Sequence, residues 1–464
     1  MCRRTENDFL GEVKIPRGRL WGIHTQRAVE NFRISPYRVS PLLIKAMAVV
    51  KKACCLANLE TGFLEKDKAG AIIKACDEIT RREHDDQFPV DPFQGGAGTS
   101  ANMNLNEVIA NRAIEIMGGA AGNYSIVDPI DDVNMHQSTN DVYPTAVKIA
   151  VLDGLKELRR RVEELQGSFQ KKEKEFADIV KTGRTEMREA VPMTLGAEFS
   201  AFSEAAARDR WRVFKCEERI RQVNLGGTAV GTGLTAPRSY IFLVIEKLRE
   251  LTGLGLARGE NAVDQTANSD SFVEVAGILR AHAANVIKIC NDLRILNLLG
   301  EIELDAVQAG SSIMPGKVNP VILESVIQAC LRADSDCGLV FETASRSTLQ
   351  INEFMPLLSF SILEAVEMLT CADAMLAPRV MAIRADRKVC AEYMDNNPMI
   401  VTAFLPYIGY EKAGDIVREF YGRKDEKINM RDFLEMKLGK EEVERVLSPE
   451  SLMSLGYRNN EKNT

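Results

Sequence analysis

The sequence contains little that would support secretion, membrane anchoring or metal binding. Its 464 residues include only 4 histidines, and these form neither an HExxH motif nor any i,i+4 pair. The 10 cysteines form no CxxC motif, so reduced and mostly buried thiols are expected rather than disulfides or zinc ligands. The N-terminus lacks the apolar segment of a signal peptide, and we find no apolar run of about 18 residues. These absences predict a cytoplasmic protein without a metal.

The charge balance argues against polyanionic partners. The net charge is -7, with 27% charged and 45% hydrophobic residues, which is an ordinary globular composition. Neither nucleic acid nor an anionic membrane is therefore expected as a partner. If the substrate is a small anion, local cationic groups must hold it.

Alternating strand patterns are nearly absent, and apolar residues instead recur at helical spacing, as in Ile149, Leu152, Leu155 and Leu158. The pattern predicts long helices that begin near Pro144, Pro192, Asp270, Pro320 and Met355. Patterns longer than about 25 residues are typical of helix bundles. Several of these helices are apolar on more than one face, so we expect the chain to form homo-oligomers through them.

These patterns predict an all-α protein with three domains. Residues 1–137 form an N-terminal domain of shorter helices and loops. Residues 138–394 form a central long-helix bundle. The sequence becomes charged and broken after about Asp395, which predicts a small helical domain at 395–464.

Polar loops directly precede the long helices, and this recurrence is the main functional signal. The first loop, 94–108, combines glycines with the hydroxyl of Thr99. The second, 136–145, places Ser138, Thr139 and Asn140 at a helix N-terminus, where backbone N–H groups favour a carboxylate. Both loops are equally consistent with simple turns and helix caps.

The third loop, 182–194, presents Thr185 and Glu186 ahead of a helix predicted to begin at Pro192. Taken alone, it fits a charged loop between helices somewhat better than a binding site. A further glycine-rich stretch, 226–234, follows a helix rather than a strand. It therefore predicts a helix stop and a tight loop, not a dinucleotide site.

The fourth loop, GSSIMPGKVNP at 310–320, carries the strongest signal. It is not a phosphate-binding P-loop, because five residues separate Gly310 from Gly316 and Val318 replaces the magnesium-binding Ser or Thr. A flexible Gly-Ser-Ser segment and a lysine, Lys317, held between Gly316 and Val318 suit proton removal beside a bound carboxylate. A purely structural loop is the alternative.

These four loops resemble the fumarase/aspartase superfamily, in which GSSIMPGKVNP is the signature and the other loops occur in the same order. The resemblance extends from about Asp8 to Gly409. Within the superfamily, DDQFPVDPFQGGAGTSANMN, QSTND and AVPMTLG are closest to the aspartate ammonia-lyase branch.

The resemblance implies a homotetramer whose central domains form a twenty-helix core, with each active site assembled from loops of three subunits. The implied reaction is reversible anti elimination of ammonia from L-aspartate to give fumarate, without a cofactor. Ser311 is the implied general base, and Lys317 and Asn319 are the implied carboxylate-binding residues. The other implied substrate contacts are Thr99, Ser138, Thr139, Asn140, Thr185 and Glu186.

Glu186 is the main departure, because fumarases and many aspartases have His there and other aspartases have Gln. A carboxylate beside a dicarboxylate substrate is unfavourable unless it is protonated or paired with Arg184, Arg188 or Arg27. Alternatively, Glu186 contacts the ammonium of an amino-acid substrate, or a substrate with extra positive charge. Aspartate ammonia-lyase is thus the leading hypothesis, followed by a lyase for a modified amino acid, fumarate hydratase, and a catalytically silent homologue.

Overall fold

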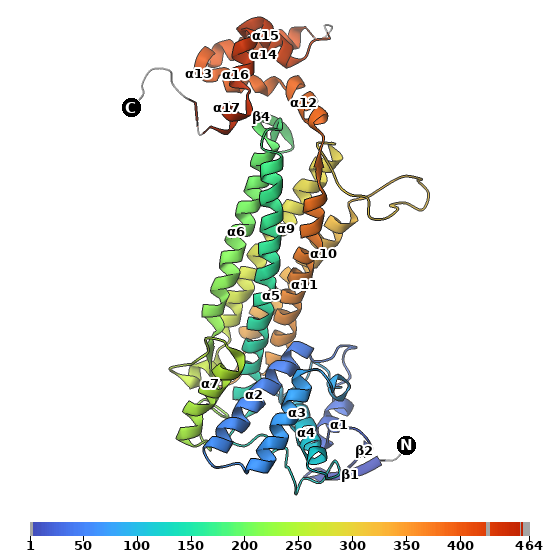
Figure 1. Ribbon diagram of the computed structural model, residues 1–464, viewed down its shortest axis with the longest axis vertical. Coiled ribbons are helices and arrows are strands. Elements are labelled where there is room, and N and C mark those ends of the chain that lie inside the picture. Colours follow the sequence, from blue (N-terminus) through green and yellow to red (C-terminus); the bar gives the residue numbers. More distant parts are fainter. Residues whose placement is uncertain (1–2, 424–426, 455, 458–464) are drawn as a thin grey trace. The chain divides into compact units, whose positions relative to one another are not determined.

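The structure is a computed structural model that describes residues 3–423, 427–454 and 456–457. It is mostly helical (Figure 1), as predicted. Its strands form only two-stranded sheets in the described part of the chain. The chain divides into two compact units, described separately below. The division passes through each of the long helices, and the three predicted domain boundaries remain a prediction.

Unit 1 comprises Met1–Arg159, Trp211–Ala283 and Leu331–Thr370. It opens with an antiparallel hairpin, β1 (Arg3–Asp8) and β2 (Gly11–Pro16). Helix α2 packs against α3 and α7, and α3 packs against α4. The shorter helices of this unit are α1 (Ile23–Asn31), α2 (Pro41–Glu60), α3 (Lys66–Thr80), α4 (Thr99–Ile116), α7 (Arg238–Thr252) and α8 (Ala262–Ala267). A short parallel pair, β5 (Gln222–Val223) and β6 (Ala257–Arg258), completes it.

The five predicted long helices are present, although two begin at other residues than expected. They are α5 (Thr139–Glu175), α6 (Leu195–Ile220), α9 (Asp270–Leu298), α10 (Val321–Ala344) and α11 (Met355–Ala382). Helix α5 begins before Pro144, which cannot donate a backbone hydrogen bond to Asn140. The Asn140 carbonyl instead accepts from Asn224 Nδ2 at 2.9 Å, so the proline is tolerated inside the helix. Pro192 lies in a strand, and α6 starts three residues later.

Close packing joins the long helices within each unit. In unit 1, Gly154 lies where a Cβ would come within 2.8 Å of Val366, so glycine allows α5 to approach α11. The Tyr143 hydroxyl also hydrogen-bonds Ser359 Oγ at 2.9 Å. In unit 2, buried phenylalanines of α5, of the residue that follows it and of α6 pack together, with ring centroids 5.2–6.4 Å apart: Phe169, Phe176, Phe199 and Phe202.

Unit 2 comprises Arg160–Arg210, Ala284–Cys330 and Cys371–Thr464. Two antiparallel pairs are central to it: β3 (Val180–Thr185) with β4 (Arg188–Thr194), and β7 (Ile302–Glu303) with β8 (Arg384–Ala385). Its C-terminal part has its own apolar core, around Phe404, Phe433 and Leu434. The elements there are α12 (Arg387–Asn396), η2 (Pro398–Phe404), α13 (Leu405–Ile408), α14 (Tyr410–Gly422), α15 (Met430–Leu438), α16 (Lys440–Val446) and α17 (Pro449–Met453).

Helix α11 is long and apolar enough to cross a membrane by length and composition, although Glu364 and Glu367 interrupt its sequence. Within its most apolar window 61% of the residues are buried inside the protein, as in the core helix of a globular protein. The cysteines match the sequence prediction. The nine that the structure describes are free thiols, and all except Cys371 are buried.

Candidate active site

The first predicted loop forms a tight turn that leads into α4. Gly98 has a left-handed φ of 96°, and a Cβ there would lie 2.6 Å from the Tyr143 ring, so only glycine fits. Thr99 is the first residue of α4, and its hydroxyl donates to the Gly96 carbonyl at 2.7 Å. The Thr99 side chain is nevertheless exposed, and it therefore remains accessible to a ligand.

The second loop forms the N-terminus of α5 and contacts α4. Thr139 Oγ1 accepts a hydrogen bond from Asn102 Nδ2 at 3.1 Å. Ser138 Oγ accepts from the Asn140 backbone N–H at 3.2 Å, and Asn140 Nδ2 donates to the Ala229 carbonyl at 2.7 Å. The first two predicted loops therefore meet within unit 1.

Two buried charged residues that the sequence analysis missed support this meeting point. The Lys51 ammonium donates to Asn134 Oδ1 and Gln137 Oε1, both at 2.9 Å, just before Ser138. Asp141 accepts from the Ser138 N–H at 2.9 Å and from two N–H groups of the 226–234 loop, at 3.0 and 3.1 Å. Burial lowers the pKa of Lys51 to about 8 and raises the pKa of Asp141 to about 6. Only long-range packing reveals either residue, because both appear in the sequence as ordinary charged helix positions.

Asp141 should make stability depend on pH. Its pKa rises from 3.8 to about 6 on folding, so the folded protein holds this proton more tightly. The protonated carboxyl therefore stabilises the folded state below pH 4. This contribution to the unfolding free energy, about 3 kcal/mol, is lost as the pH rises to 6. We expect the unfolding free energy of wild type minus that of Asp141→Asn, measured by denaturant titration, to fall across this interval. A difference that stays constant would contradict this assignment.

The third loop is a β-hairpin, not the predicted helix-start loop. Strands β3 and β4 pair from Val180↔Thr194 to Thr185↔Arg188. Glu186 and Met187 form the two-residue tip with left-handed φ values of 51° and 59°. Such tips normally use Asn-Gly, and each non-glycine residue in this conformation costs roughly 1–2 kcal/mol. The usual turn signal is absent, so the sequence did not indicate a hairpin.

Thr185 and Glu186 are exposed at this tip. Of the three arginines considered as partners for Glu186, Arg184 binds Glu301 at 2.6 Å and Arg27 binds Asp8 at 2.8 Å. Arg188 is exposed beside the tip and makes no ion pair with Glu186 in the described structure. Within the described part of the chain, no ion pair or hydrogen bond holds the Glu186 carboxylate. This carboxylate is therefore available to a ligand.

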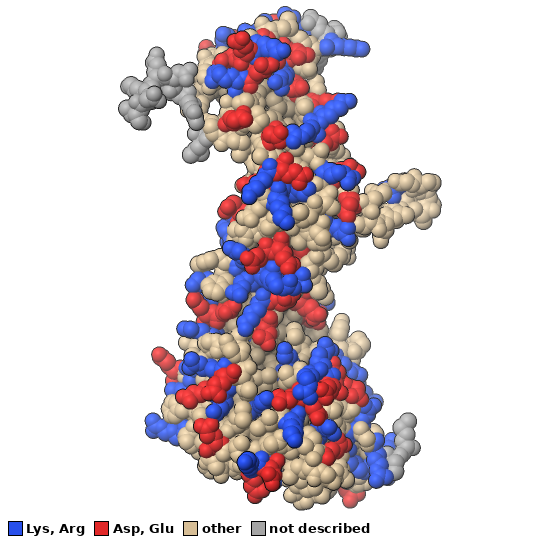
Figure 2. All heavy atoms as spheres, in the orientation of Figure 1, with Lys and Arg blue, Asp and Glu red and all other residues tan. Residues whose placement is uncertain are grey.

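The fourth loop closes on itself at its base. The Gly310 N–H donates to the Lys317 carbonyl at 2.8 Å, and Asn319 Nδ2 donates to the Gly310 carbonyl at 2.8 Å. A Cβ on Gly310 would lie 2.8 Å from the Lys317 carbonyl oxygen, so this closure requires glycine. The loop projects from the neighbouring helices of its unit (Figure 1). Figure 2 shows a largely uncharged projection, and Lys317 is the only charged residue between 306 and 323.

Ser311 occupies a distinctive position in this loop. Its Oγ accepts backbone N–H groups from Ile313 at 3.2 Å and Met314 at 2.9 Å. Two donors that point at one hydroxyl oxygen favour its negatively charged form. Lys317 is exposed in the same loop and adds a positive charge.

The predicted residues thus form two groups. Thr99, Ser138, Thr139 and Asn140 belong to unit 1, and Thr185, Glu186, Ser311, Lys317 and Asn319 belong to unit 2. Contacts join the loops of the first group directly. The assembly of both groups into one active site remains a proposal.

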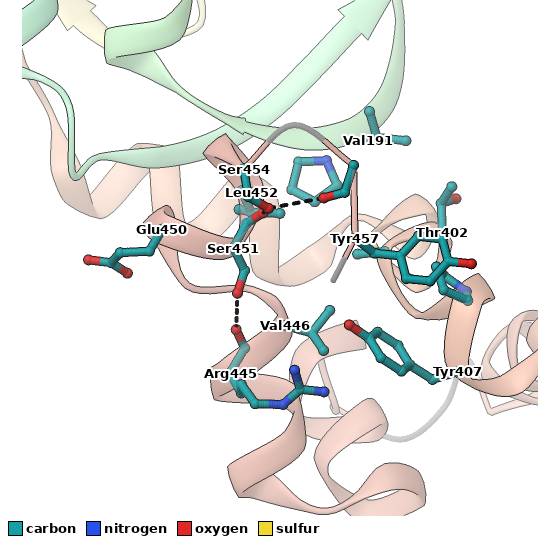
Figure 3. Close-up of a pocket in the computed structure, with 14 residues that line it drawn as sticks. Val191, Thr402, Tyr407, Arg445, Val446, Glu450, Ser451, Leu452, Ser454 and Tyr457 are labelled. Atoms are coloured by element: carbon teal, nitrogen blue, oxygen red, sulfur yellow. Dashed lines mark hydrogen bonds between the residues drawn. The ribbon is translucent and has the colours of Figure 1, made fainter. Parts of the chain in front are cut away.

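A separate cavity of about 550 Å³ lies in unit 2 between β4 and the C-terminal helices (Figure 3). Val191 and Pro192 of β4 line it together with Tyr407 and Arg445. Figure 3 shows Val191 on the side of the cavity away from Arg445. None of the nine predicted site residues lines it. Arg445 is already paired with Glu442 at 2.5 Å, so its charge is not free for an anionic substrate. The cavity is therefore not the candidate active site.

Comparison with known proteins agrees with the resemblance seen in the loops. The Lyase family model matches residues 11–334. Curated relatives named aspartate ammonia-lyase include one from a Bacillus species, 43% identical over 90% of this chain and 91% of the relative. Another, from Escherichia coli K12, is 41% identical over 98% and 97%.

Solved structures show the same fold. A fumarate lyase:delta crystallin from Brucella melitensis, bound to cobalt, has a TM-score of 0.92 at 42% identity, covering 97% of this chain and 99% of that one. A class II fumarase from Schistosoma mansoni has a TM-score of 0.90 at 29% identity, covering 97% and 98%. Both comparisons confirm the predicted helical fold class. The chain belongs to the lyase family of the aspartase/fumarase superfamily.

Proposed function

We propose that this protein catalyses the reversible elimination of ammonia from L-aspartate to give fumarate, without a cofactor. The observation that carries the proposal is Ser311, whose Oγ accepts two backbone N–H groups in a loop that also holds Lys317. Near-full-length relatives carry the name aspartate ammonia-lyase, which supports this substrate over malate.

In the proposed mechanism, ionised Ser311 removes a proton from Cβ of aspartate. The electron pair of the C–H bond passes into the carboxylate beside it, which gains a second negative charge. Lys317 and Asn319 bind this carboxylate, and their donors stabilise the charge as it develops. The electron pair then forms the C=C bond while the Cα–N bond breaks and ammonia leaves. Ser311 carries the proton until it is returned to solvent.

The remaining predicted residues would bind and orient the substrate. Ser138, Thr139 and Asn140 lie at the N-terminal end of α5, where the helix dipole attracts a carboxylate. Thr99 begins α4 beside them, and Thr185 adds a hydroxyl from the hairpin. Holding the substrate in one orientation is what makes the elimination anti, because base and leaving group must lie on opposite faces.

We further propose a homotetramer with active sites shared between subunits. Large apolar side chains are exposed on the long helices of unit 1, including Trp211 (62%), Phe214 (45%), Leu331 (56%) and Phe341 (56%). Such exposure on a helix face indicates a surface that another copy covers. Sharing would bring the loops of unit 1 in one subunit to the loops of unit 2 in another.

The proposal is tested by incubating the purified protein with L-aspartate or L-malate while following fumarate absorbance and ammonia. We expect fumarate and ammonia in equal amounts from L-aspartate. Fumarate from L-malate alone would establish a hydratase. No turnover of either substrate at any pH would support a modified substrate or a silent homologue.

The Glu186 carboxylate favours a substrate that carries an amino group. The second candidate function is therefore a lyase that acts on a modified, more cationic amino acid. The free Glu186 carboxylate at the hairpin tip would attract an ammonium group and repel a dicarboxylate that lacks one. We expect Glu186→Gln to lower kcat/KM for L-aspartate about 10-fold, because a charge-assisted hydrogen bond contributes about 1.5–3 kcal/mol. Steady-state kinetics would measure this change. Unchanged or improved activity would show that Glu186 is merely tolerated.

A further inference from the structure

Glu301 is a buried carboxylate that joins the two catalytic segments of unit 2. It follows α9 and directly precedes β7, ten residues before Ser311. Its side chain is 0% exposed. Nevertheless it contacts two cations of strand β3: Lys181 Nζ lies 2.8 Å from Oε2, and Arg184 Nη1 lies 2.6 Å from Oε1. These ion pairs link the root of the Ser311 loop to the hairpin that carries Thr185 and Glu186.

The backbone of Glu301 anchors the same point to α12. Its carbonyl accepts from the Asp386 N–H at 3.0 Å, and β7 pairs with β8 immediately afterwards. The Arg184 guanidinium also lies 4.9 Å from the ring centre of Tyr393 in α12. The β3–β4 hairpin, the start of the segment that leads to Ser311 and helix α12 therefore all contact one another at Glu301 and Arg184. We call this contact region the junction.

The charges at this junction balance. Lys181 also pairs with Glu198 at 2.6 Å, so two cations face two carboxylates. Burying a charge is costly unless its partners are held at short range, and removing one partner leaves the other charge buried without compensation. Both cationic side chains are thus constrained by the position of Glu301.

We propose that Glu301 is a positioning residue that fixes the hairpin tip relative to the Ser311 loop. This inference rests on the proposed lyase function, because it concerns the geometry of that active site. Glu301 holds the root of the loop and leaves residues 304–320 to close over substrate. The link matters because a displacement of about 1 Å between reacting groups lowers a rate by about 100-fold.

Glu301→Gln tests the proposal, with Glu198→Gln as its matched control. Both variants remove a carboxylate from Lys181, but Glu198 lies on α6 and contacts neither Arg184 nor β7 in the described structure. We expect Glu301→Gln to lower kcat by 10- to 100-fold with less than a 3-fold change in KM. Glu198→Gln should keep kcat within 3-fold.

Hydrogen exchange supplies a readout that does not depend on activity. In Glu301→Gln, amide exchange at 182–190 and at 302–310 should rise together, while the C-terminal core around Phe433 stays protected. A rise confined to one segment, or equal effects in Glu198→Gln, would overturn the coupling. Activity of the wild-type protein on L-aspartate distinguishes failure of the proposed function from failure of the positioning role. If the wild type does not turn over L-aspartate, the proposed function is refuted, but hydrogen exchange still tests the link through Glu301.

A second variant covers the case in which Glu301→Gln does not fold. Arg184→Lys retains the charge and removes the planar fork, so it should give an intermediate loss of kcat and an intermediate rise in exchange. Wild-type kcat and wild-type exchange in Arg184→Lys would count against the proposal.

Discussion

Replacement of Ser311 by alanine is expected to lower kcat by about 10²- to 10⁴-fold, the usual contribution of a positioned general base. The variant loses the oxygen that takes the Cβ proton, while Lys317 and Asn319 still bind the carboxylate. KM should therefore change little. Steady-state kinetics on L-aspartate and size-exclusion chromatography would show an intact but inactive oligomer.

Ser312→Ala is the matched control for this loss. Ser312 is the neighbouring residue, is exposed, and makes no hydrogen bond that the structure records. Its variant should retain activity within a few-fold of wild type. Near-normal activity in Ser311→Ala, or an equal loss in Ser312→Ala, would refute Ser311 as the base.

Mixing two inactive variants should restore activity if active sites are shared between subunits. One partner carries Ser311→Ala in unit 2, and the other carries Ser138→Ala with Thr139→Ala in unit 1. In randomly reassembled tetramers, about a quarter of the sites would combine an intact Ser311 with an intact Ser138–Thr139 pair from another subunit. Activity of the dissociated and reassembled mixture should therefore rise towards about a quarter of the wild-type value.

As a control, each variant is dissociated and reassembled alone, which measures any activity that refolding by itself restores. Native mass spectrometry would verify that hybrid oligomers have formed. Hybrid tetramers without activity would show that both loops of each site come from one chain, which would contradict the shared-site proposal.

The long helices could be predicted because their signals are local. Helix α9 begins at Asp270 and α11 at Met355, where capping residues and the apolar spacing place them. The start of α5 differs from the prediction because a long-range contact satisfies a backbone group that the local proline rule treats as unsatisfied. Asn224 satisfies the carbonyl that Pro144 leaves without a partner, so α5 begins earlier than its proline suggested.

The candidate site was only partly predictable for the same reason. The loop residues were found because motif and spacing survive in a linear sequence. Lys51 and Asp141 were missed because their shifted pKa values depend on burial by distant segments. Glu301 was missed because its importance lies in ion pairs more than 100 positions away, with Lys181 and Arg184.

The sequence alone thus determined the helical class, the superfamily and the order of the four loops, since each depends on periodicity or on a contiguous motif. Only the tertiary structure turned the third loop into a hairpin with Glu186 at its tip, because strand pairing supplies the hydrogen bonds that offset a left-handed Glu-Met turn. Only folding, likewise, placed two amide donors on Ser311 and buried Glu301 between two cations. Charge and hydrogen-bond energies depend on distance and burial, and a linear sequence contains neither.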